Sequence, residues 1–228
     1  MVREVEVAVI GAGSAGLTAF FVVKKTTKDC VLINGGEVGT TCARVGCMPS
    51  KVGIHVADSM HHPKTFGRYG IEGGKALSID QEEALEYIRD MRDDFVDGVL
   101  AGTIDEFSDE EFIEGYAQFV DVNTLQVGEQ TIKAKKIVIA TGSSPVLPEA
   151  WKAFGDKVIT TDQLFELEVL PESMAVIGLG VIGLELGQML SRLGVNVTGV
   201  DQLDVVAHLA DPVVAKVAEE TFAREFPL

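Results

Sequence analysis

Residues 8–17 read AVIGAGSAGL, and residues 175–184 repeat that run as AVIGLGVIGL, 167 positions further along the chain. Each copy joins an apolar strand to a G-x-G-x-x-G turn and then to an apolar helix pattern, which is the order of a dinucleotide-binding βαβ unit. The glycines permit the tight turn, let a pyrophosphate approach the backbone and let the helix pack closely on the strand, while the helix N-terminus receives the phosphates. One such turn is weak evidence, but two, each preceded by a strand, predict two bound dinucleotides.

The two turns supply the first candidate cofactor-binding residues. They are Gly11, Gly13, Ser14, Ala15 and Gly16 in the first turn, and Gly178, Gly180, Val181, Ile182 and Gly183 in the second. For either copy alone, the alternative is a glycine-rich turn in an α/β domain that holds no nucleotide.

A residue that binds the adenosine ribose is expected about twenty positions after each turn, at the end of the second strand. In the second copy it is Asp201, whose carboxylate can accept hydrogen bonds from both ribose hydroxyls. No arginine follows closely, so a 2′-phosphate would meet negative charge, and NAD is favoured over NADP. The equivalent residue of the first copy is Asn34, which can bond one hydroxyl well but carries no charge.

The sequence therefore predicts an α/β fold with two Rossmann-like dinucleotide-binding units. The first is expected over residues 1–147, with an inserted antiparallel meander at 112–117, 124–127 and 130–132, and the second, incomplete, over 148–228. Helices are expected at 50–58 and 80–102, with a loop at 63–74. A buried strand at 136–140 leads into Ala140, Thr141 and Gly142, a turn that suits close contact with a cofactor and equally suits an ordinary strand exit.

Two cysteines, Cys42 and Cys47, lie five residues apart about one βα unit after the first turn. Five residues of regular helix advance about 7.5 Å along the axis. The Cα atoms of a disulfide usually lie no more than about 6.8 Å apart, so a bonded pair requires a bent or loosely wound segment. Gly46 can supply the backbone freedom, and Pro49 suits the first turn of a following helix. The alternative is two thiols that are close in sequence by chance.

The bulk composition excludes several classes of protein. The 228 residues are 46% hydrophobic, enough for a real core, and the net charge of −16 argues against nucleic acid or an anionic membrane as a partner. Three cysteines are few for a secreted disulfide framework, and the strand pattern at the start leaves no room for a signal peptide, so we expect a cytoplasmic protein. No run of eighteen apolar residues occurs. The histidines fit surface positions better than a metal site.

Taken together, these residues resemble the pyridine nucleotide–disulfide oxidoreductases, and within them the dihydrolipoamide dehydrogenase branch. The order of the motifs agrees along the whole chain, and the run GCMPSK at 46–51 is similar to the family's C-x-P-S-K ending. Mercuric reductases share that ending, whereas the glutathione reductase branch usually has P-K-K.

The resemblance implies a set of roles. The first turn would bind FAD and the second NAD(P)H. Cys47 would face the flavin as the charge-transfer thiolate, and Cys42 would be the outer thiol that exchanges with substrate. Lys51 would lie near the flavin's reactive nitrogen and pair with Glu185. Further cofactor contacts would come from Thr41, Gly115, Ala117, Ala140, Thr141 and Gly142. The chain departs from the family at Asn34, where glutamate is usual, and at Thr40, which replaces one of two usual glycines.

Family members run to about twice this length. Their second half completes the flavin domain and adds a dimerisation domain with a His-Glu pair that protonates the outer thiol across a homodimer. We therefore expect a fragment with little or no activity, from an enzyme that passes electrons from a dithiol or lipoyl-domain substrate through Cys42 and Cys47 to FAD and NAD. The alternatives are a stand-alone flavin- or nucleotide-binding redox module without turnover, and a mercuric reductase-like enzyme.

Overall fold

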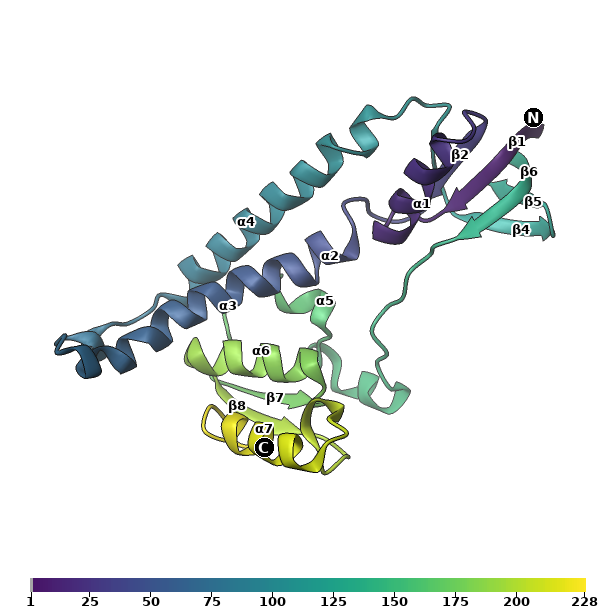
Figure 1. The fold of residues 1–228 in the computed structure, drawn as a ribbon. Coiled ribbons are helices and arrows are strands. Elements are labelled where there is room, and N and C mark those ends of the chain that lie inside the picture. Colours follow the sequence, from purple (N-terminus) through teal and green to yellow (C-terminus); the bar gives the residue numbers. More distant parts are fainter. Residues whose placement is uncertain (1) are drawn as a thin grey trace. The chain divides into compact units, whose positions relative to one another are not determined.

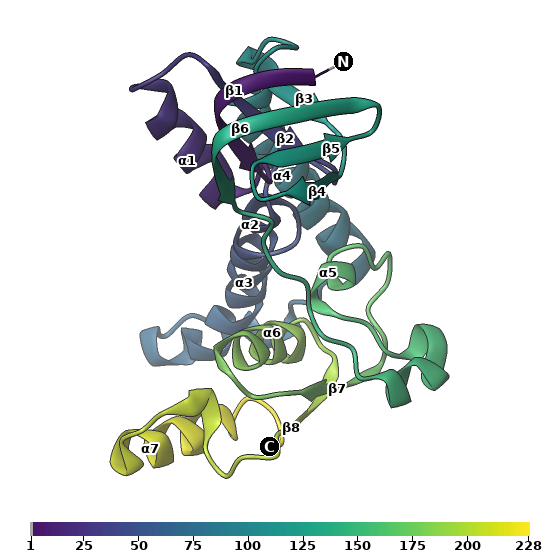
Figure 2. The same cartoon turned by 90° about the vertical axis from the view of Figure 1, so that its right-hand side faces the viewer.

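Strand β1 (Val2–Ile10) lies at the centre of a six-stranded sheet in the computed structural model, which describes residues 2–228. The sheet order is β3-β2-β1-β6-β5-β4 (Figure 2). Strands β2 (Cys30–Asn34), β3 (Phe112–Glu114) and β6 (Gln130–Ile139) extend it with parallel pairings, and β5 (Thr124–Val127) and β4 (Ala117–Asp121) add antiparallel ones.

The apolar run of β1 is buried on both faces of this sheet. On one face Val9 packs with Leu17 and Phe20 of helix α1 (Ser14–Lys24). On the other face Ala8 and Ile10 pack with residues of β2, β3, β5 and β6. Burial on both sides explains why β1 and β2 read as nearly continuous apolar runs, as strands of parallel sheets do.

The predicted meander is wrong in part. Residues 112–114 do not join an antiparallel hairpin but pair in parallel with β2, while the hairpin is made by β4 and β5. The segments expected at 130–132 and 136–140 form one strand, β6, which pairs with β5 on one side and β1 on the other. Alternation of apolar and polar residues marks a half-buried strand but does not reveal which neighbour it pairs with.

The chain forms two compact units, and their ranges differ from the expected division at 147/148. One contains the described residues up to Met48 and residues 92–162; the other contains residues 49–91 and 163–228. Two long helices, α3 (Cys47–His61) and α4 (Gln81–Ala101), each contribute residues to both units. The parts of α3 and α4 that lie within residues 49–91 belong to the second unit because they contact helix α6 and the residues that follow it.

The second unit is built around helix α6 (Val181–Arg192) and the parallel pair β7 (Ser173–Ile177) and β8 (Asn196–Val200) (Figure 1). A Cβ placed on Gly53 of α3 would lie 2.5 Å from Sδ of Met189 in α6, so the two helices are in close contact. The Gln81 amide of α4 donates to the carbonyl oxygen of Leu193 at 2.8 Å.

The last residues of the chain close this unit. The Phe226 ring packs where side chains on Gly187 and Gly199 would otherwise stand, and the backbone N–H of Gly199 donates to the carbonyl oxygen of Pro227 at 2.8 Å. Arg192 bonds Glu225 through Nη2 at 2.5 Å and Nε at 3.1 Å, and also bonds Asp58. The pKa of Glu225 is held below its usual range, chiefly by the hydrogen bond from Arg192.

The remaining elements are short or peripheral. The helices predicted at 50–58 and 80–102 correspond to α3 and α4, and the loop expected at 63–74 contains two 3-10 helices. The other elements are α2 (Thr41–Arg44), α5 (Thr161–Leu164), α7 (Pro212–Phe222) and 3-10 segments at His62–Tyr69, Gly74–Ala76, Ile104–Glu106, Glu149–Lys157 and Val206–His208. None of the described helices combines the length and the apolar character needed to cross a bilayer.

Candidate functional site

The first glycine-rich turn connects β1 to α1 at the carboxyl end of the sheet. Gly11 has φ +102°, and a Cβ there would collide with the carbonyl oxygen of Ala140 at the end of β6. A Cβ on Gly16 would collide with the carbonyl oxygen of Gly11, so both positions require glycine. At Gly13, by contrast, nothing lies within 4 Å of a Cβ. The turn is therefore closed on its inner side and open at the glycine where a pyrophosphate would approach.

The predicted contacts around this turn lie close together. Ser14 and Ala15 are exposed in the first turn of α1, and Ala140 and Thr141 adjoin Gly11. Gly142, at φ +72°, continues the same strand exit. This arrangement favours the reading of residues 140–142 as part of a nucleotide site.

Asn34 holds the turn in shape through both ends of its amide. Its Oδ1 accepts from the backbone N–H of Ala12 at 3.0 Å, and its Nδ2 donates to the carbonyl oxygen of Gly36 at 2.6 Å. The sequence predicts a ribose contact for Asn34 but gives no sign of this structural role. Beside it, the N–H of Gly115 donates to the carbonyl oxygen of Asn34 at 2.8 Å.

Gly115 also meets a steric requirement, because it has φ +151° and a Cβ there would lie 2.6 Å from Val127. Ala117 begins β4 opposite Val127. Between them, Tyr116 was not identified from the sequence. Its ring packs where a Cβ on Gly35 would stand, yet the residue is 76% exposed.

The two cysteines occupy a break between helices. Cys42 lies in α2, which ends at Arg44, and Cys47 is the first residue of α3. The bent segment required for a bonded pair is therefore present. The role of Gly46 differs from the expected one: its φ is not positive, but a Cβ there would lie 3.0 Å from the carbonyl oxygen of Thr41 and 3.4 Å from Cα of Cys42. Gly46 thus allows the chain to turn closely against α2.

Cys42 and Cys47 are thiols in this structure, and their side chains interact. Hydrogen bonding with the Cys47 side chain and then burial raise the pKa of the Cys42 thiol. Cys42 is half-buried and Cys47 exposed, so Cys47 is the more accessible of the two. The assignment of Cys42 as the outer, exchanging thiol stays a prediction, as does the disulfide.

Thr40, next to Thr41 at the start of α2, has φ +68° and ψ +145°, a backbone conformation that favours glycine. Its Oγ1 accepts from the backbone N–H of Ala43 at 3.2 Å and so caps α2. The replacement of a usual glycine by threonine is therefore accompanied by a helix cap that glycine lacks.

The second glycine-rich turn repeats the geometry of the first. Gly178 has φ +97°, and a Cβ on Gly183 would collide with the carbonyl oxygen of Gly178. Asp201 accepts from the backbone N–H of Leu179 at 2.5 Å and from that of Leu203 at 2.9 Å. These backbone donors, that of Leu203 foremost, lower the pKa of Asp201, so it is a carboxylate at neutral pH.

Comparison with known proteins agrees with this pair of turns. A family model described as pyridine nucleotide-disulphide oxidoreductase matches residues 5–225. The chain belongs to this family. It is 31% identical over 223 residues to dihydrolipoyl dehydrogenase 2 (chloroplastic) of Arabidopsis thaliana, with 95% of this chain and 38% of that protein covered. It is 30% identical over 227 residues to the mercuric reductase of Staphylococcus aureus, with 97% and 40% covered.

Solved structures show the same fold. The HOCl-induced flavoprotein disulfide reductase RclA from Escherichia coli matches with a TM-score of 0.78 at 23% identity, over 96% of this chain and 47% of that one. This chain thus spans less than half the length of each of these relatives. The resemblance to the pyridine nucleotide-disulphide oxidoreductases expected from the motifs is confirmed.

In this member of the pyridine nucleotide-disulphide oxidoreductases, Lys51 and Glu185 form the ion pair expected from the resemblance. Lys51 Nζ donates to Glu185 Oε1 at 2.6 Å, from α3 to the second turn of α6. The Lys51 side chain is 62% exposed and that of Glu185 32%. An exposed pair of this kind adds little to stability.

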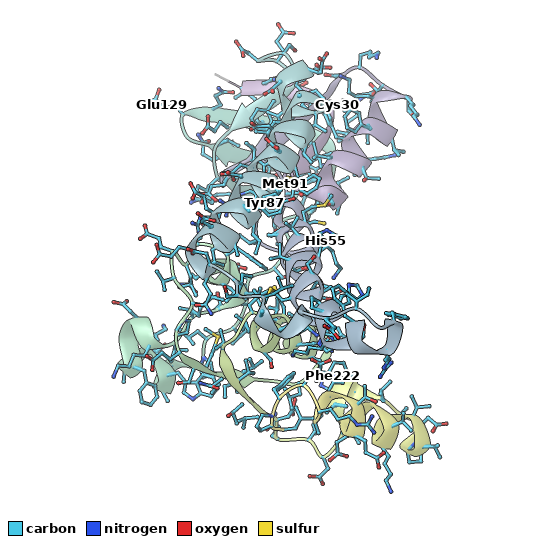
Figure 3. The ribbon with its side chains drawn as sticks, turned by 90° about the vertical axis from the view of Figure 1, so that its left-hand side faces the viewer. Cys30, His55, Tyr87, Met91, Glu129 and Phe222 are labelled. Carbon is cyan, nitrogen blue, oxygen red and sulfur yellow. The ribbon has the colours of Figure 1, made fainter. Side chains whose placement is uncertain are left out.

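The other predicted residues of the second turn are also accessible. Val181 and Ile182 open α6 and are exposed. Gly180 lies before them, and the nearest atom to a Cβ there is Cε1 of His208 at 3.6 Å. His208 belongs to no recognisable sequence motif. Within residues 2–228, no three His, Cys, Asp or Glu side chains group into a metal site, and His55 is an exposed residue of α3 (Figure 3).

Proposed function

We propose that this chain is the dinucleotide-binding part of a flavoprotein disulfide oxidoreductase of the dihydrolipoyl dehydrogenase type. FAD would bind the first turn and NAD the second. The observation that carries the proposal is the contact between the Cys42 and Cys47 side chains within the unit that holds the first turn.

The residues present fit the two dinucleotides. Gly13 leaves open space at the start of α1, where the helix N-terminus can receive the diphosphate of FAD. Asp201 offers a carboxylate at the end of β8, which favours the 2′-hydroxyl of NAD over the 2′-phosphate of NADP. Asn34 keeps the first turn in shape but brings no charge to the ribose.

In this proposal the cysteine pair cycles between disulfide and dithiol. A dithiol substrate attacks the Cys42–Cys47 disulfide, forms a mixed disulfide and leaves as its own disulfide, and the pair is left as two thiols. Two electrons and two protons thus move from the substrate to the pair. FAD held at the first turn would supply the redox chemistry that links the two thiols of the pair to NAD at the second turn.

Substrate, assembly and location are further proposals. The substrate would be a small dithiol or a lipoyl domain, and the longer protein to which this chain corresponds would be a homodimer. A cycling dithiol suits the reducing cytoplasm.

A mercuric reductase-like activity is the second candidate, and the similarity to the enzyme of Staphylococcus aureus favours it. The two candidates differ in the substrate that reacts with the cysteine pair: a dithiol, which reduces the Cys42–Cys47 disulfide, or a mercuric ion, which binds the reduced thiols. Oxidation of NADH or NADPH that depends on Hg²⁺ rather than on lipoamide would select this alternative.

The test counts thiols in the purified chain. Mild oxidation should remove two of the three thiols in the wild type, and NADH should restore both when FAD is bound. Cys42→Ser and Cys47→Ser should each abolish the change. Cys30→Ala is the matched control, because Cys30 is buried in β2, and its variant should still lose two thiols.

Three thiols remaining after oxidation of the wild type would contradict the redox pair. Reversible oxidation of two thiols with bound flavin, but without reduction by NADH, would instead support the stand-alone redox module.

A further inference from the structure

The 3-10 segment Val206–His208 has an unusual backbone. Ala207 has φ +55° and His208 has φ +54°, so two successive residues other than glycine adopt the left-handed conformation. Such residues are uncommon, and strain of this kind concentrates at ligand sites. The surrounding structure must therefore hold the segment in place.

Burial of one side chain and a backbone hydrogen bond to the second turn hold the segment in place. The Val206 side chain is buried at 5% exposure, and the backbone N–H of Ala207 donates to the carbonyl oxygen of Leu179 at 2.7 Å. Leu179 is the residue between the first two glycines of that turn, and its own N–H donates to Asp201. The strained segment, the glycine-rich turn and the ribose carboxylate are thus joined by successive hydrogen bonds.

The result is that an imidazole lies beside the middle glycine. Cε1 of His208 is 3.6 Å from a Cβ position on Gly180, whereas the equivalent Gly13 of the first turn has nothing within 4 Å. The middle glycine is where the backbone approaches a pyrophosphate. His208 is exposed, so a ligand at the turn can reach its imidazole.

The chemistry of the side chain matches that position. An imidazole carries at least one N–H donor in either protonation state, and a diphosphate offers anionic acceptors. Asp201, one of the acidic residues behind the net charge of −16, places negative charge beside the turn, so an N–H donor here would partly offset its repulsion of an anionic ligand.

We propose that His208 donates a hydrogen bond to the diphosphate of the dinucleotide bound at the second turn. The proposal rests on the proposed second nucleotide site and assigns to it a residue outside the glycine motif. The strained backbone at residues 207 and 208 serves to aim this imidazole at Gly180.

The experiment measures the dissociation constant of NADH, and separately of nicotinamide riboside, for the purified chain at fixed salt. His208→Ala removes the donor. His208→Gly removes it too but relieves the strain, because glycine adopts positive φ readily. His55→Ala, a histidine exposed on α3, is the matched control.

We expect both His208 variants to bind NADH about tenfold more weakly, the size of one hydrogen bond to a charged group. Binding of nicotinamide riboside, which has no diphosphate, should be unchanged, and His55→Ala should match the wild type. Equal loss for both ligands would indicate general damage to the turn and overturn the proposal.

Two other results would also overturn it. Unchanged NADH affinity in both variants would show that the His208 imidazole makes no contact with the diphosphate. NADH binding to the wild type would in that case still support the second nucleotide site. Tighter binding would mean that His208 obstructs the turn. If the wild type does not bind NADH, the proposed second nucleotide site is itself contradicted, and the role of His208 is contradicted with it.

Discussion

The two glycine-rich turns have nearly the same local geometry on very different supports. Gly11 and Gly178 have φ +102° and +97°, and in both turns the third glycine packs against the carbonyl oxygen of the first. The first turn extends from the middle of a six-stranded sheet, the second from a two-stranded sheet closed by the chain's last residues. The turn is therefore specified by its own glycines and by one acceptor, Asn34 or Asp201, rather than by the extent of the sheet.

The largest expected effects come from a matched pair of glycine substitutions. Gly16→Ala and Gly183→Ala each place a Cβ on a backbone carbonyl, which we expect to destabilise the local turn by about 3 kcal/mol. Gly16→Ala should lose FAD and keep NADH, and Gly183→Ala the reverse, as measured by equilibrium binding. Gly98→Ala, in open space on α4, is the control and should bind both. Loss of both ligands in either variant would show that the turns are not independent.

Next in size is the effect of the closing ion-pair cluster. Arg192→Met removes the hydrogen bonds to Glu225 and Asp58 and leaves two carboxylates without their partner. We expect a loss of about 2 kcal/mol, seen as faster amide hydrogen exchange in residues 163–228 and unchanged exchange in β1, β2 and β6. Arg224→Met, an exposed neighbour, is the control. Equal acceleration in both units would contradict the separate support of the two turns.

Exchanging the two acceptors tests whether each suits only its own turn. Asn34→Asp replaces the donor to the Gly36 carbonyl by a second acceptor, and Asp201→Asn sets an amide group against backbone N–H donors. Each change should reduce the free energy of unfolding by about 1 kcal/mol in a denaturant titration. The exposed Asp204→Asn should have no effect. A more stable Asn34→Asp variant would show that the first turn prefers the charge of the second.

The smallest effect is the pH dependence of the second unit. Burial lowers the pKa of His61, and repulsion from Arg192 and Lys64 lowers it further. Two nearby carboxylates, Glu225 and Asp58, act in the opposite direction. The Oε2 atom of Glu225 lies 3.9 Å from the Nδ1 atom of His61. The unfolded chain then binds the proton more readily, so the free energy of unfolding should fall as the pH drops below about 6.5. His61→Gln should remove this slope between about pH 7 and 5 in thermal melts. A slope that persists would assign it to another group.

The sequence predicted well what depends on short runs of residues. Gly11, Gly16, Gly178 and Gly183 identify the two turns, and β1, β2 and α1 follow from the apolar pattern around them. The Lys51–Glu185 pair came from resemblance, and the structure contains it. The break in the helix between Cys42 and Cys47 was predicted from the Cα separation that a disulfide allows. Gly46 permits the break by packing closely against α2, without a positive φ.

What the sequence missed depends on distant partners. The apolar pattern of residues 80–102 predicts that Tyr87 lies on the inner side of its helix, yet Tyr87 is 49% exposed. Figure 3 labels this residue on α4. The buried face of a helix is set by its neighbours. The parallel pairing of β3 and the packing of residues 49–91 with α6 join segments far apart in the chain. His208 and Tyr116 carry no motif, and only the folded chain brings them to Gly180 and Gly35.

The sequence by itself determined that this protein has two dinucleotide turns, a cysteine pair after the first, and membership of a family with those features. These are local properties, fixed by glycine's lack of a side chain and by spacing along the backbone. The tertiary structure decided which strand β3 joins, where the long helices pack, which groups hold each turn and what faces its middle glycine. Those outcomes depend on contacts between remote segments, whose energies no short run of residues contains.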